Sequence, residues 1–335
     1  MSATVVVTGG GGFIGSAVVR RLVRAIHVGV PPRFADGAIV GRVVALLRPG
    51  GSAERLSELA ASSAWSIEHA DLADRGELAQ ALRRAAPRAI FHVALPDNGT
   101  GAPVATLETL FQALVNVPGA RLIHTGSAWV LAAGSALDER APTDPRSAYA
   151  RAKLLEDESL PELGACAGVG WIDLRLFNVF GRYEQPSRLI PHLVERLARG
   201  EPAQLSHGGQ MRDFTDVDAM ADAYLLALRA DEAACGALYH VGSGHGTSAR
   251  GLAMLVAELV GSPSLLRFGD ARTADDDVPS LVADPRLARD VLGWVPPSAL
   301  GAAVERTVAW WLDRLDVGDA AARKVGRPSR EDAVL

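Results

Sequence analysis

The glycine-rich stretch T-G-G-G-G-F-I-G at residues 8–15 constrains the fold more than any other feature of the sequence. It follows a β-branched run at 4–8 and opens a segment, 12–25, whose apolar residues have helical spacing. In such a strand–turn–helix unit one glycine permits a tight turn, a second admits a phosphate close to the backbone, and a third lets helix and strand pack closely. Free N–H groups at the start of the helix attract a pyrophosphate. We therefore predict a dinucleotide site here, contacted by Gly9, Gly12, Phe13, Ile14 and Gly15.

Strand-like and helix-like segments alternate through the first half of the chain. Strands are expected at 4–8, Ile39–Leu47, Trp65–His69, 89–93 and 121–125. Helices are expected at 12–25, 54–60, 75–86 and 104–115. This alternation is typical of an α/β fold in which helices cover both faces of a parallel sheet. We predict a doubly wound parallel (Rossmann) sheet with a smaller, interleaved C-terminal substrate lobe.

The pattern changes after Phe177, because prolines separate shorter elements. Helical spacing continues at 189–199, 219–229 and 248–259, and Ala237–Val241 is expected to be a late strand of the sheet. The expected division is a dinucleotide-binding domain at 1–177 with about 213–244 returning to it, a substrate-binding lobe at 178–212 and 245–315, and a disordered, polar tail at 316–335.

Composition excludes several classes of partner. The net charge is −5, whereas nucleic-acid binding needs a basic face, so we expect no nucleic-acid partner. The two cysteines are too few for a disulfide-stapled secreted fold. The start of the chain lacks a signal-peptide pattern, and no run of about 18 apolar residues occurs. We expect a cytoplasmic protein without a membrane partner, and the sequence indicates no metal site.

The residue after the second strand bears on the choice of cofactor. An acidic side chain there binds the ribose of NAD, whereas arginine accommodates the 2′-phosphate of NADP. Arg48 occupies this place, and its planar guanidinium suits a phosphate. NADP(H) is therefore favoured, with NAD(H) as the alternative. Asp71 and Leu72 follow the third strand, where an aspartate accepts from the adenine amino group.

A set of three side chains predicts acid–base chemistry. Tyr149 and Lys153 are four residues apart, so on a helix they share a face. A nearby ammonium favours the phenolate and brings the tyrosine pKa toward the range where protons move readily at neutral pH. Ser127 follows the fifth strand, and its hydroxyl is placed to bond the reacting oxygen. We predict Ser127, Tyr149 and Lys153 as the catalytic residues.

With these motifs in view, the chain resembles the extended short-chain dehydrogenase/reductases, the NAD-dependent epimerase/dehydratase group that acts on nucleotide sugars. The resemblance covers about residues 5–312. The motifs that carry it are TGGGGFIG, AIFHVA ending at Ala94, HTGSAWV, YARAK, LRLFNVFG, GQMRDFTDVD, YHVGSG and LGWVP.

The resemblance implies further site residues and an assembly. Asn178 and Arg212 correspond to residues that contact the diphosphate of a sugar nucleotide, and guanidinium groups suit that task. Arg188 is the expected companion, Arg272 the expected late phosphate-binding arginine, and Ala94 a residue beside the cofactor. Many members dimerise through a four-helix bundle that includes the Y-x-x-x-K helix. The resemblance therefore implies a homodimer.

Two departures from the family pattern narrow the expected reaction. Dehydratases of the family carry an Asp–Glu pair directly after the catalytic Ser or Thr, and its decarboxylases carry a Glu at the second of these places. Here the two residues are Ala128 and Trp129. We therefore favour an NADPH-dependent reductase of a 4-keto-6-deoxy nucleotide sugar. The alternatives are a nucleotide-sugar 4-epimerase with tightly bound NAD+ and, third, a non-catalytic dinucleotide-binding regulator.

Overall fold

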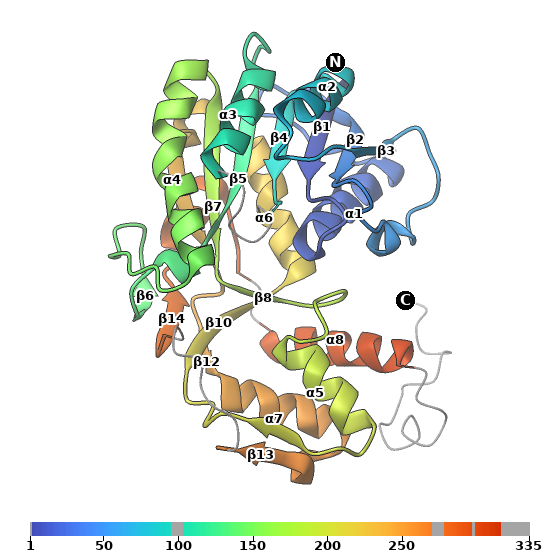
Figure 1. Ribbon diagram of the computed structural model, residues 1–335, viewed down its shortest axis with the longest axis vertical. Helices are drawn as coiled ribbons and strands as arrows, with labels where there is room; N and C mark the ends of the chain where they lie inside the picture. The colour runs from blue at the N-terminus through green and yellow to red at the C-terminus, as the bar shows by residue number, and fades with distance from the viewer. Residues whose placement is uncertain (1, 95–102, 270–277, 297–298, 316–335) are drawn as a thin grey trace.

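The computed structural model describes residues 2–94, 103–269, 278–296 and 299–315, and it contains a large parallel sheet (Figure 1). The sheet has seven strands in the order β11-β7-β5-β4-β1-β2-β3, and all neighbours are parallel. Its strands are β1 (Ser2–Thr8), β2 (Ile39–Leu47), β3 (Trp65–His69), β4 (Ala89–His92), β5 (Arg121–Ser127), β7 (Gly170–Leu176) and β11 (Ala237–Val241).

Helices cover both faces of this sheet, which confirms the predicted doubly wound architecture (Figure 1). One face carries α1 (Phe13–His27) and α6 (Val217–Arg229), and the other carries α2 (Arg75–Ala85), α3 (Pro103–Leu114) and α4 (Ala148–Ala167). Successive side chains of a strand alternate between the faces. Val5 and Val7 accordingly pack toward α1 and α6, whereas Val6 packs toward α2 and α3. Both faces are buried, so the strands are almost continuously apolar.

A smaller lobe lies below the carboxyl ends of the strands in Figure 1. Its core is formed by α5 (Leu189–Ala198), α7 (Ala249–Val260) and α8 (Leu300–Arg314). Two small sheets accompany the helices. They contain β6 (Gly134–Leu137), β8 (Asn178–Phe180), β10 (Met211–Asp216), β12 (Gly246–Ser248) and β14 (Ser280–Ala283), and, separately, β9 (Ala203–Leu205) with β13 (Leu266–Phe268).

Some elements differ from the sequence-based expectation. The helix predicted at 54–60 is a single 3-10 turn, η1 (Glu54–Leu56), because Ala53 provides no side-chain cap and only Leu56 is buried. Late in the chain, Trp294 packs into the core beneath α1 and α6, and its indole donates to the Gly242 carbonyl at 3.0 Å. The predicted tail at 316–335 lies outside the described residues. Within the described ranges, no helix has the length and apolar character needed to cross a membrane.

The order of the strands reverses at β1, which lies between β4 and β2. The chain runs from β1 outward through β2 to β3, and then crosses back to β4. At such a point the loops on the two sides diverge and leave a crevice outside the carboxyl ends of the strands. The glycine turn after β1 lies at this crevice, which places the predicted dinucleotide site at the ligand position of the fold.

A buried arginine joins α1 to the segment around η1. Arg20 is 1% exposed, its Nε lies 3.0 Å from Glu58 Oε1, and its Nη1 donates to the Arg55 carbonyl at 2.8 Å. The same guanidinium lies 5.0 Å from the ring centroid of Tyr183, which comes from the loop after β8. One side chain therefore holds together α1, the segment after β2 and the entrance to the smaller lobe.

We predict that Arg20→Met destabilises the protein by about 1–3 kcal/mol, because a buried carbonyl and a partly buried carboxylate lose charged hydrogen-bonding partners. The matched control is Arg21→Met, since the Arg21–Asp222 pair is exposed at both ends. Exposed pairs contribute about 0–1 kcal/mol, so this change is nearly neutral. Denaturant unfolding of both variants measures the difference, and equal losses would contradict the assignment.

Candidate active site

The turn after β1 is shaped by close backbone approach. Gly9 has φ +65°, and a Cβ there would lie 2.8 Å from the Ala94 Cα. A Cβ on Gly15 would collide with the Gly9 carbonyl oxygen. Gly12 caps α1 without a side-chain hydrogen bond, and the first turn of the helix has no acidic residue. The first N–H groups of α1 are therefore left for a ligand, and the turn fits a dinucleotide pyrophosphate. Phe13 and Ile14 are partly buried against the core behind the turn.

A buried hydroxyl joins this turn to the end of β4. Thr8 Oγ1 lies 2.8 Å from His92 Nδ1 and accepts from the Ala94 N–H at 3.4 Å. These residues are 84 and 86 positions away from Thr8 in the chain. Burial lowers the pKa of His92 to about 3, so its ring is neutral at physiological pH. The predicted cofactor residues Gly9 and Ala94 are thus brought into contact by the structure.

The residues predicted for the adenosine end lie at the ends of the next two strands. Arg48 is exposed and directly follows β2. Asp71 follows β3 closely, and its Oδ1 accepts from the Ala73 N–H at 2.9 Å. Leu72 is partly buried against the α2–α3 core. Arg55 lies near this end, and its Nη1 donates to the Gly11 carbonyl at 3.2 Å. The arrangement places Arg48 and Arg55 beyond the second strand, at the predicted adenosine end of the dinucleotide site.

The predicted catalytic residues gather at the carboxyl end of β5. Ser127 is the last residue of β5, and its Oγ accepts from the Trp129 N–H at 3.3 Å. Helix α4 packs on β5 and on the turn after it. Tyr149 lies in the first turn of α4 and is 41% exposed, whereas Lys153 is 2% exposed. Ser147 caps this helix by accepting from the Ala150 N–H at 3.1 Å. The phenol is therefore accessible to solvent, whereas the ammonium is buried.

Lys153 lies in a polar network that the sequence analysis did not find. Its Nζ donates to the Thr125 carbonyl at 3.0 Å and to Glu156 Oε2 at 2.7 Å. The same carboxylate oxygen lies 3.1 Å from His124 Nε2, and His124 Nδ1 lies 2.7 Å from Asp173 Oδ1. Burial alone would lower the pKa of Lys153, but the charge of Glu156 and the hydrogen bond to it raise that pKa above the ordinary value.

Three members of this region bring possible metal-ligand atoms close together. Atoms of His124, Asp157 and Asp173 lie within 4.8 Å of one another. His124 Nδ1 is hydrogen-bonded to Asp173, and Asp157 Oδ2 accepts from Arg175 Nη2 at 2.7 Å. A guanidinium and a buried ammonium already balance these carboxylates, and a divalent cation beside them would meet like charge. We interpret the group as an ion-pair network.

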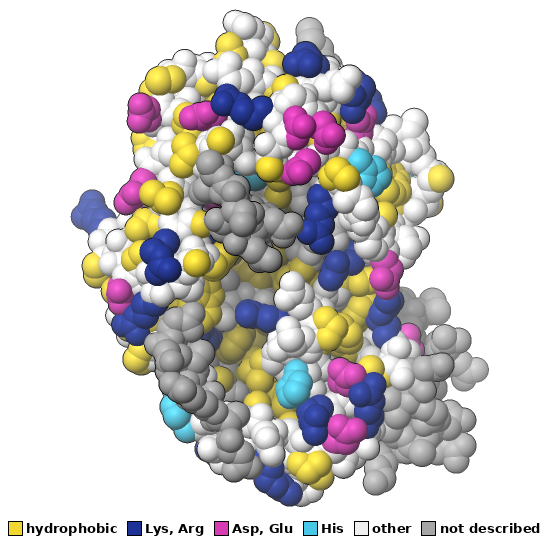
Figure 2. Space-filling model, viewed as in Figure 1, with side chains coloured by type: hydrophobic (Ala, Val, Ile, Leu, Met, Phe, Trp, Pro, Cys, Tyr) yellow, Lys and Arg dark blue, Asp and Glu magenta, His cyan; other side chains and the backbone are white. Residues whose placement is uncertain are grey.

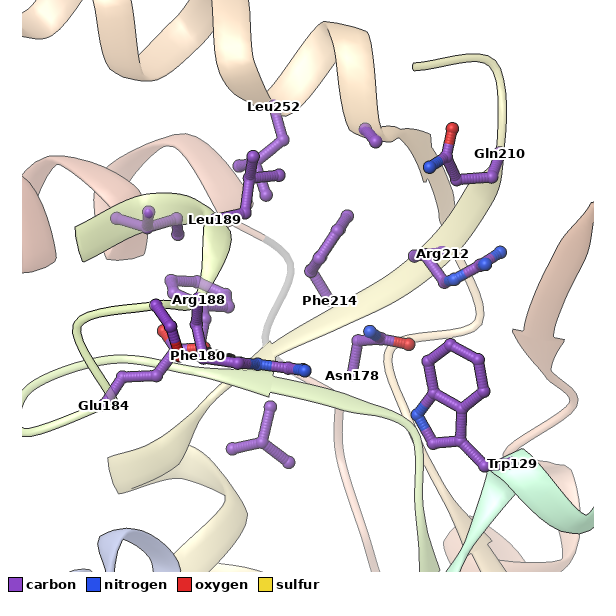
Figure 3. Close-up of a pocket in the computed structure, with 14 residues that line it drawn as sticks. Trp129, Asn178, Phe180, Glu184, Arg188, Leu189, Gln210, Arg212, Phe214 and Leu252 are labelled. Carbon is purple, nitrogen blue, oxygen red and sulfur yellow. Dashed lines mark ion pairs between the residues drawn. The ribbon is translucent and has the colours of Figure 1, made fainter. Parts of the chain in front are cut away.

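A second pocket region lies between β8, β10 and α5 (Figure 3). Arg212 is 4% exposed, and its guanidinium lies 5.3 Å from the ring centroid of Trp129. Asn178 projects beside them, and among the described residues none donates to its buried Oδ1. Arg188 precedes α5 and reaches toward the pocket from the other side. The structure therefore brings Asn178, Arg188 and Arg212 to one pocket. The fourth predicted residue, Arg272, lies outside the described residues.

The face of the molecule in Figure 2 is hollowed between the sheet domain and the smaller lobe, and Lys or Arg side chains border the hollow. Glu184 also lines the pocket, which the sequence analysis missed. It is 6% exposed, and Arg188 Nε lies 3.5 Å from its Oε1. Burial raises the pKa of Glu184 to about 7 against the opposing charge of Arg188. Glu184 lies in the short loop between β8 and α5, where no local pattern signals burial, so only the packing of the two elements reveals it.

The sequence matches a known family model. The model of the NAD-dependent epimerase/dehydratase family covers residues 5–242, which include the glycine turn, the Y-x-x-x-K helix and the β10 arginine.

Curated relatives and a solved structure agree with this match. The dTDP-glucose 4,6-dehydratase of Neisseria meningitidis serogroup B is 27% identical, over 92% of this chain and 93% of the relative. The UDP-glucose 4-epimerase of Azospirillum brasilense is 29% identical, over 96% of each. A double mutant of the dTDP-glucose 4,6-dehydratase of Streptomyces venezuelae, solved with NAD bound, superposes with a TM-score of 0.80 at 25% identity. That alignment covers 92% of this chain and 97% of the other.

We predict that Gly15→Ala weakens binding of the nicotinamide dinucleotide about 5- to 150-fold, because the added Cβ pushes α1 away from the Gly9 carbonyl at a cost of about 1–3 kcal/mol. Gly301→Ala is the control, since a Cβ there meets no atom within 4 Å. Fluorescence titration with NADH and NADPH measures both variants. Unchanged affinity in Gly15→Ala would place the pyrophosphate elsewhere.

Proposed function

Because the chain belongs to the NAD-dependent epimerase/dehydratase family, we propose that it is an NADPH-dependent reductase of a 4-keto-6-deoxy nucleotide sugar. The observation that carries the proposal is the pair of residues after Ser127. Ala128 is buried, and Trp129 lines the pocket beside Arg212. No carboxylate follows the serine, so the chain lacks the groups that expel water from a sugar in the family's dehydratases. Reduction and epimerisation require only Ser127, Tyr149 and Lys153 with the nicotinamide.

In the proposed reaction the chain's own residues position the substrate and deliver a proton. Bound NADPH supplies the hydride. Tyr149 donates its phenolic proton to the oxygen of the sugar carbonyl as that oxygen becomes an alkoxide. Ser127 hydrogen-bonds the same oxygen, and Lys153 keeps positive charge beneath the phenol.

The pocket between β8, β10 and α5 is proposed to bind the diphosphate of the substrate. Arg212 and Arg188 lie on opposite sides of it and offer guanidinium donors, which bind phosphate oxygens in pairs. Asn178 adds an amide between them. Trp129 lines this pocket and lies two residues after Ser127, so its indole would contact the sugar. The diphosphate thereby holds the sugar carbonyl at the catalytic residues.

A variant of the phenol and a variant of the pocket separate the two proposed roles. Tyr149→Phe is expected to lower kcat about 10²–10⁴-fold with little change in KM, because it removes general acid catalysis alone. Arg188→Ala is expected to raise KM about tenfold to a hundredfold with a smaller effect on kcat, because a charged hydrogen bond contributes about 1.5–3 kcal/mol. Steady-state kinetics with NADPH and a 4-keto-6-deoxy nucleotide sugar measures both. Near-normal turnover of Tyr149→Phe would move the proton donor elsewhere.

The preference for NADPH is proposed to rest on Arg48. Arg48→Ala is expected to weaken NADPH binding by about 1.5–3 kcal/mol and to leave NADH binding nearly unchanged, because only NADPH carries the 2′-phosphate. Parallel titrations with the two cofactors measure the difference. Equal losses for both cofactors, or tighter binding of NADH by the unaltered protein, would reject this role for Arg48.

The second candidate is a nucleotide-sugar 4-epimerase, which the 29% identity to the Azospirillum enzyme favours. An epimerase of this kind returns its hydride to the substrate and keeps its cofactor bound, whereas a reductase exchanges NADPH in every turnover. Mass spectrometry of ligand released from freshly purified protein distinguishes them, since retained NAD+ would favour the epimerase. A non-catalytic regulator is disfavoured, because such a protein has no need of Ser127, Tyr149 and Lys153 together.

A further inference from the structure

The inner face of α4 carries charge where packing alone would require apolar residues. Its buried residues include Lys153 and Glu156, three positions apart, followed by Leu160. Glu156 is 0% exposed, although a buried carboxylate costs several kcal/mol unless it is paired. Leucine or alanine would fill this position without that cost. The carboxylate therefore requires an explanation beyond the packing of α4 on the sheet.

The partners of Glu156 form a chain of alternating charge. Glu156 Oε2 accepts a hydrogen bond from Lys153 Nζ at 2.7 Å and lies 3.1 Å from His124 Nε2. The other ring nitrogen of His124, Nδ1, lies 2.7 Å from Asp173 Oδ1. Burial alone would lower the pKa of His124, but Asp173 and Glu156 raise it to about 9. Burial would likewise raise the pKa of Glu156, but Lys153 and His124 hold it below its ordinary value. Two cations thus share one carboxylate oxygen at neutral pH.

The groups around this chain come from every element packed against it. Those that titrate or carry charge are Tyr149 and Asp157 on α4, His92 on β4, His124 on β5, Asp173 and Arg175 on β7, and Tyr224 on α6 from the opposite face. Helix α3 contributes uncharged Thr109 to its buried side, and its single acidic residue, Glu108, pairs with Arg75. Of these groups, Glu156 alone has an ion pair with Lys153 among the described residues.

We propose that Glu156 is a positioning residue that holds Lys153 against the end of β5 and extends to higher pH the range in which Lys153 is charged. The proposal rests on the proposed function for the roles of Tyr149 and Lys153. The Thr125 carbonyl fixes Lys153 from one side and Glu156 from the other. The carboxylate also balances the charge of the buried ammonium.

Removal of the Glu156 charge is expected to shift the pH dependence of kcat in one direction. In Glu156→Gln, the buried Lys153 loses its proton at lower pH, because the carboxylate that offset the cost of burying its charge is gone. The cation that assists proton transfer from Tyr149 is then lost at lower pH. The basic limb of kcat for reduction is therefore expected to move down by about 1–3 pH units. A purely structural role would lower kcat at all pH values and leave the limb in place.

Two further variants serve as controls for the pH shift expected in Glu156→Gln. His124→Gln removes the competing cation from Glu156, so the basic limb is expected at the same pH or higher, opposite to Glu156→Gln. Asp157→Asn changes the next carboxylate on α4, which pairs with Arg175 and acts on Lys153 only from a greater distance, so it is expected to move the limb by less than Glu156→Gln does. If Glu156→Gln does not fold, Glu156→Asp retains the charge at a greater distance and is expected to give a smaller downward shift.

A measurement without substrate separates this proposal from the proposed function. The protein has eight histidines, and the His124→Gln variant identifies the His124 signal in an NMR titration. Loss of the Glu156 charge is expected to lower the His124 pKa by about 1–3 units. If the unaltered protein reduces no 4-keto-6-deoxy nucleotide sugar, the proposed function fails while the NMR titration still tests the network. An active protein whose basic limb stays in place in Glu156→Gln overturns the proposal for Glu156.

Discussion

The contact between the glycine turn after β1 and the residues that follow β4 positions the elements around the candidate active site. Gly9 and Ala94 approach so closely that no Cβ fits between them, and Thr8 accepts the N–H of Ala94. This contact lies at the carboxyl end of β1, where the strand order of the sheet reverses. The start of α1, the ends of β4 and β5 and the crevice for the dinucleotide are all positioned relative to it. A wider separation here would displace the pyrophosphate from the start of α1 and hence the nicotinamide from Tyr149.

The elements around the crevice hold their charged side chains in two different environments, one lining a pocket and one closed to solvent. At the proposed diphosphate pocket, Arg188 lies at the rim beside Glu184, and the Arg212 guanidinium stacks on Trp129. Beneath the catalytic helix the cations have no access to water, so they are balanced inside the protein by Glu156 and Asp173. The structure therefore combines a pocket bordered by arginines with a closed ion-pair network beneath α4.

Local signals allowed the fold to be predicted from sequence, and they are also the basis on which the central site residues are proposed. Glycine spacing and β-branched runs report on backbone geometry within a few residues, which is why the turn at Gly9 and strands such as Ile39–Leu47 could be recognised. The network around Glu156 could not be, because His124 is 32 positions away and Lys-x-x-Glu on a helix ordinarily faces water. Similarly, the pairing of β14 with β6 joins segments far apart in the chain, and no local pattern encodes it.

The residues after Ser127 connect the reaction to the architecture of the pocket. A base at this position would have to act on the sugar from the end of β5, yet Ala128 is buried and Trp129 turns its ring toward Arg212. The indole thus lines the pocket beside Arg212, two residues after Ser127. In the proposed reductase reaction the sugar would receive a hydride and a single proton, the latter from Tyr149. Under that proposal, the aromatic ring that replaces the family's carboxylate would limit the reaction through the same contact that shapes the binding pocket.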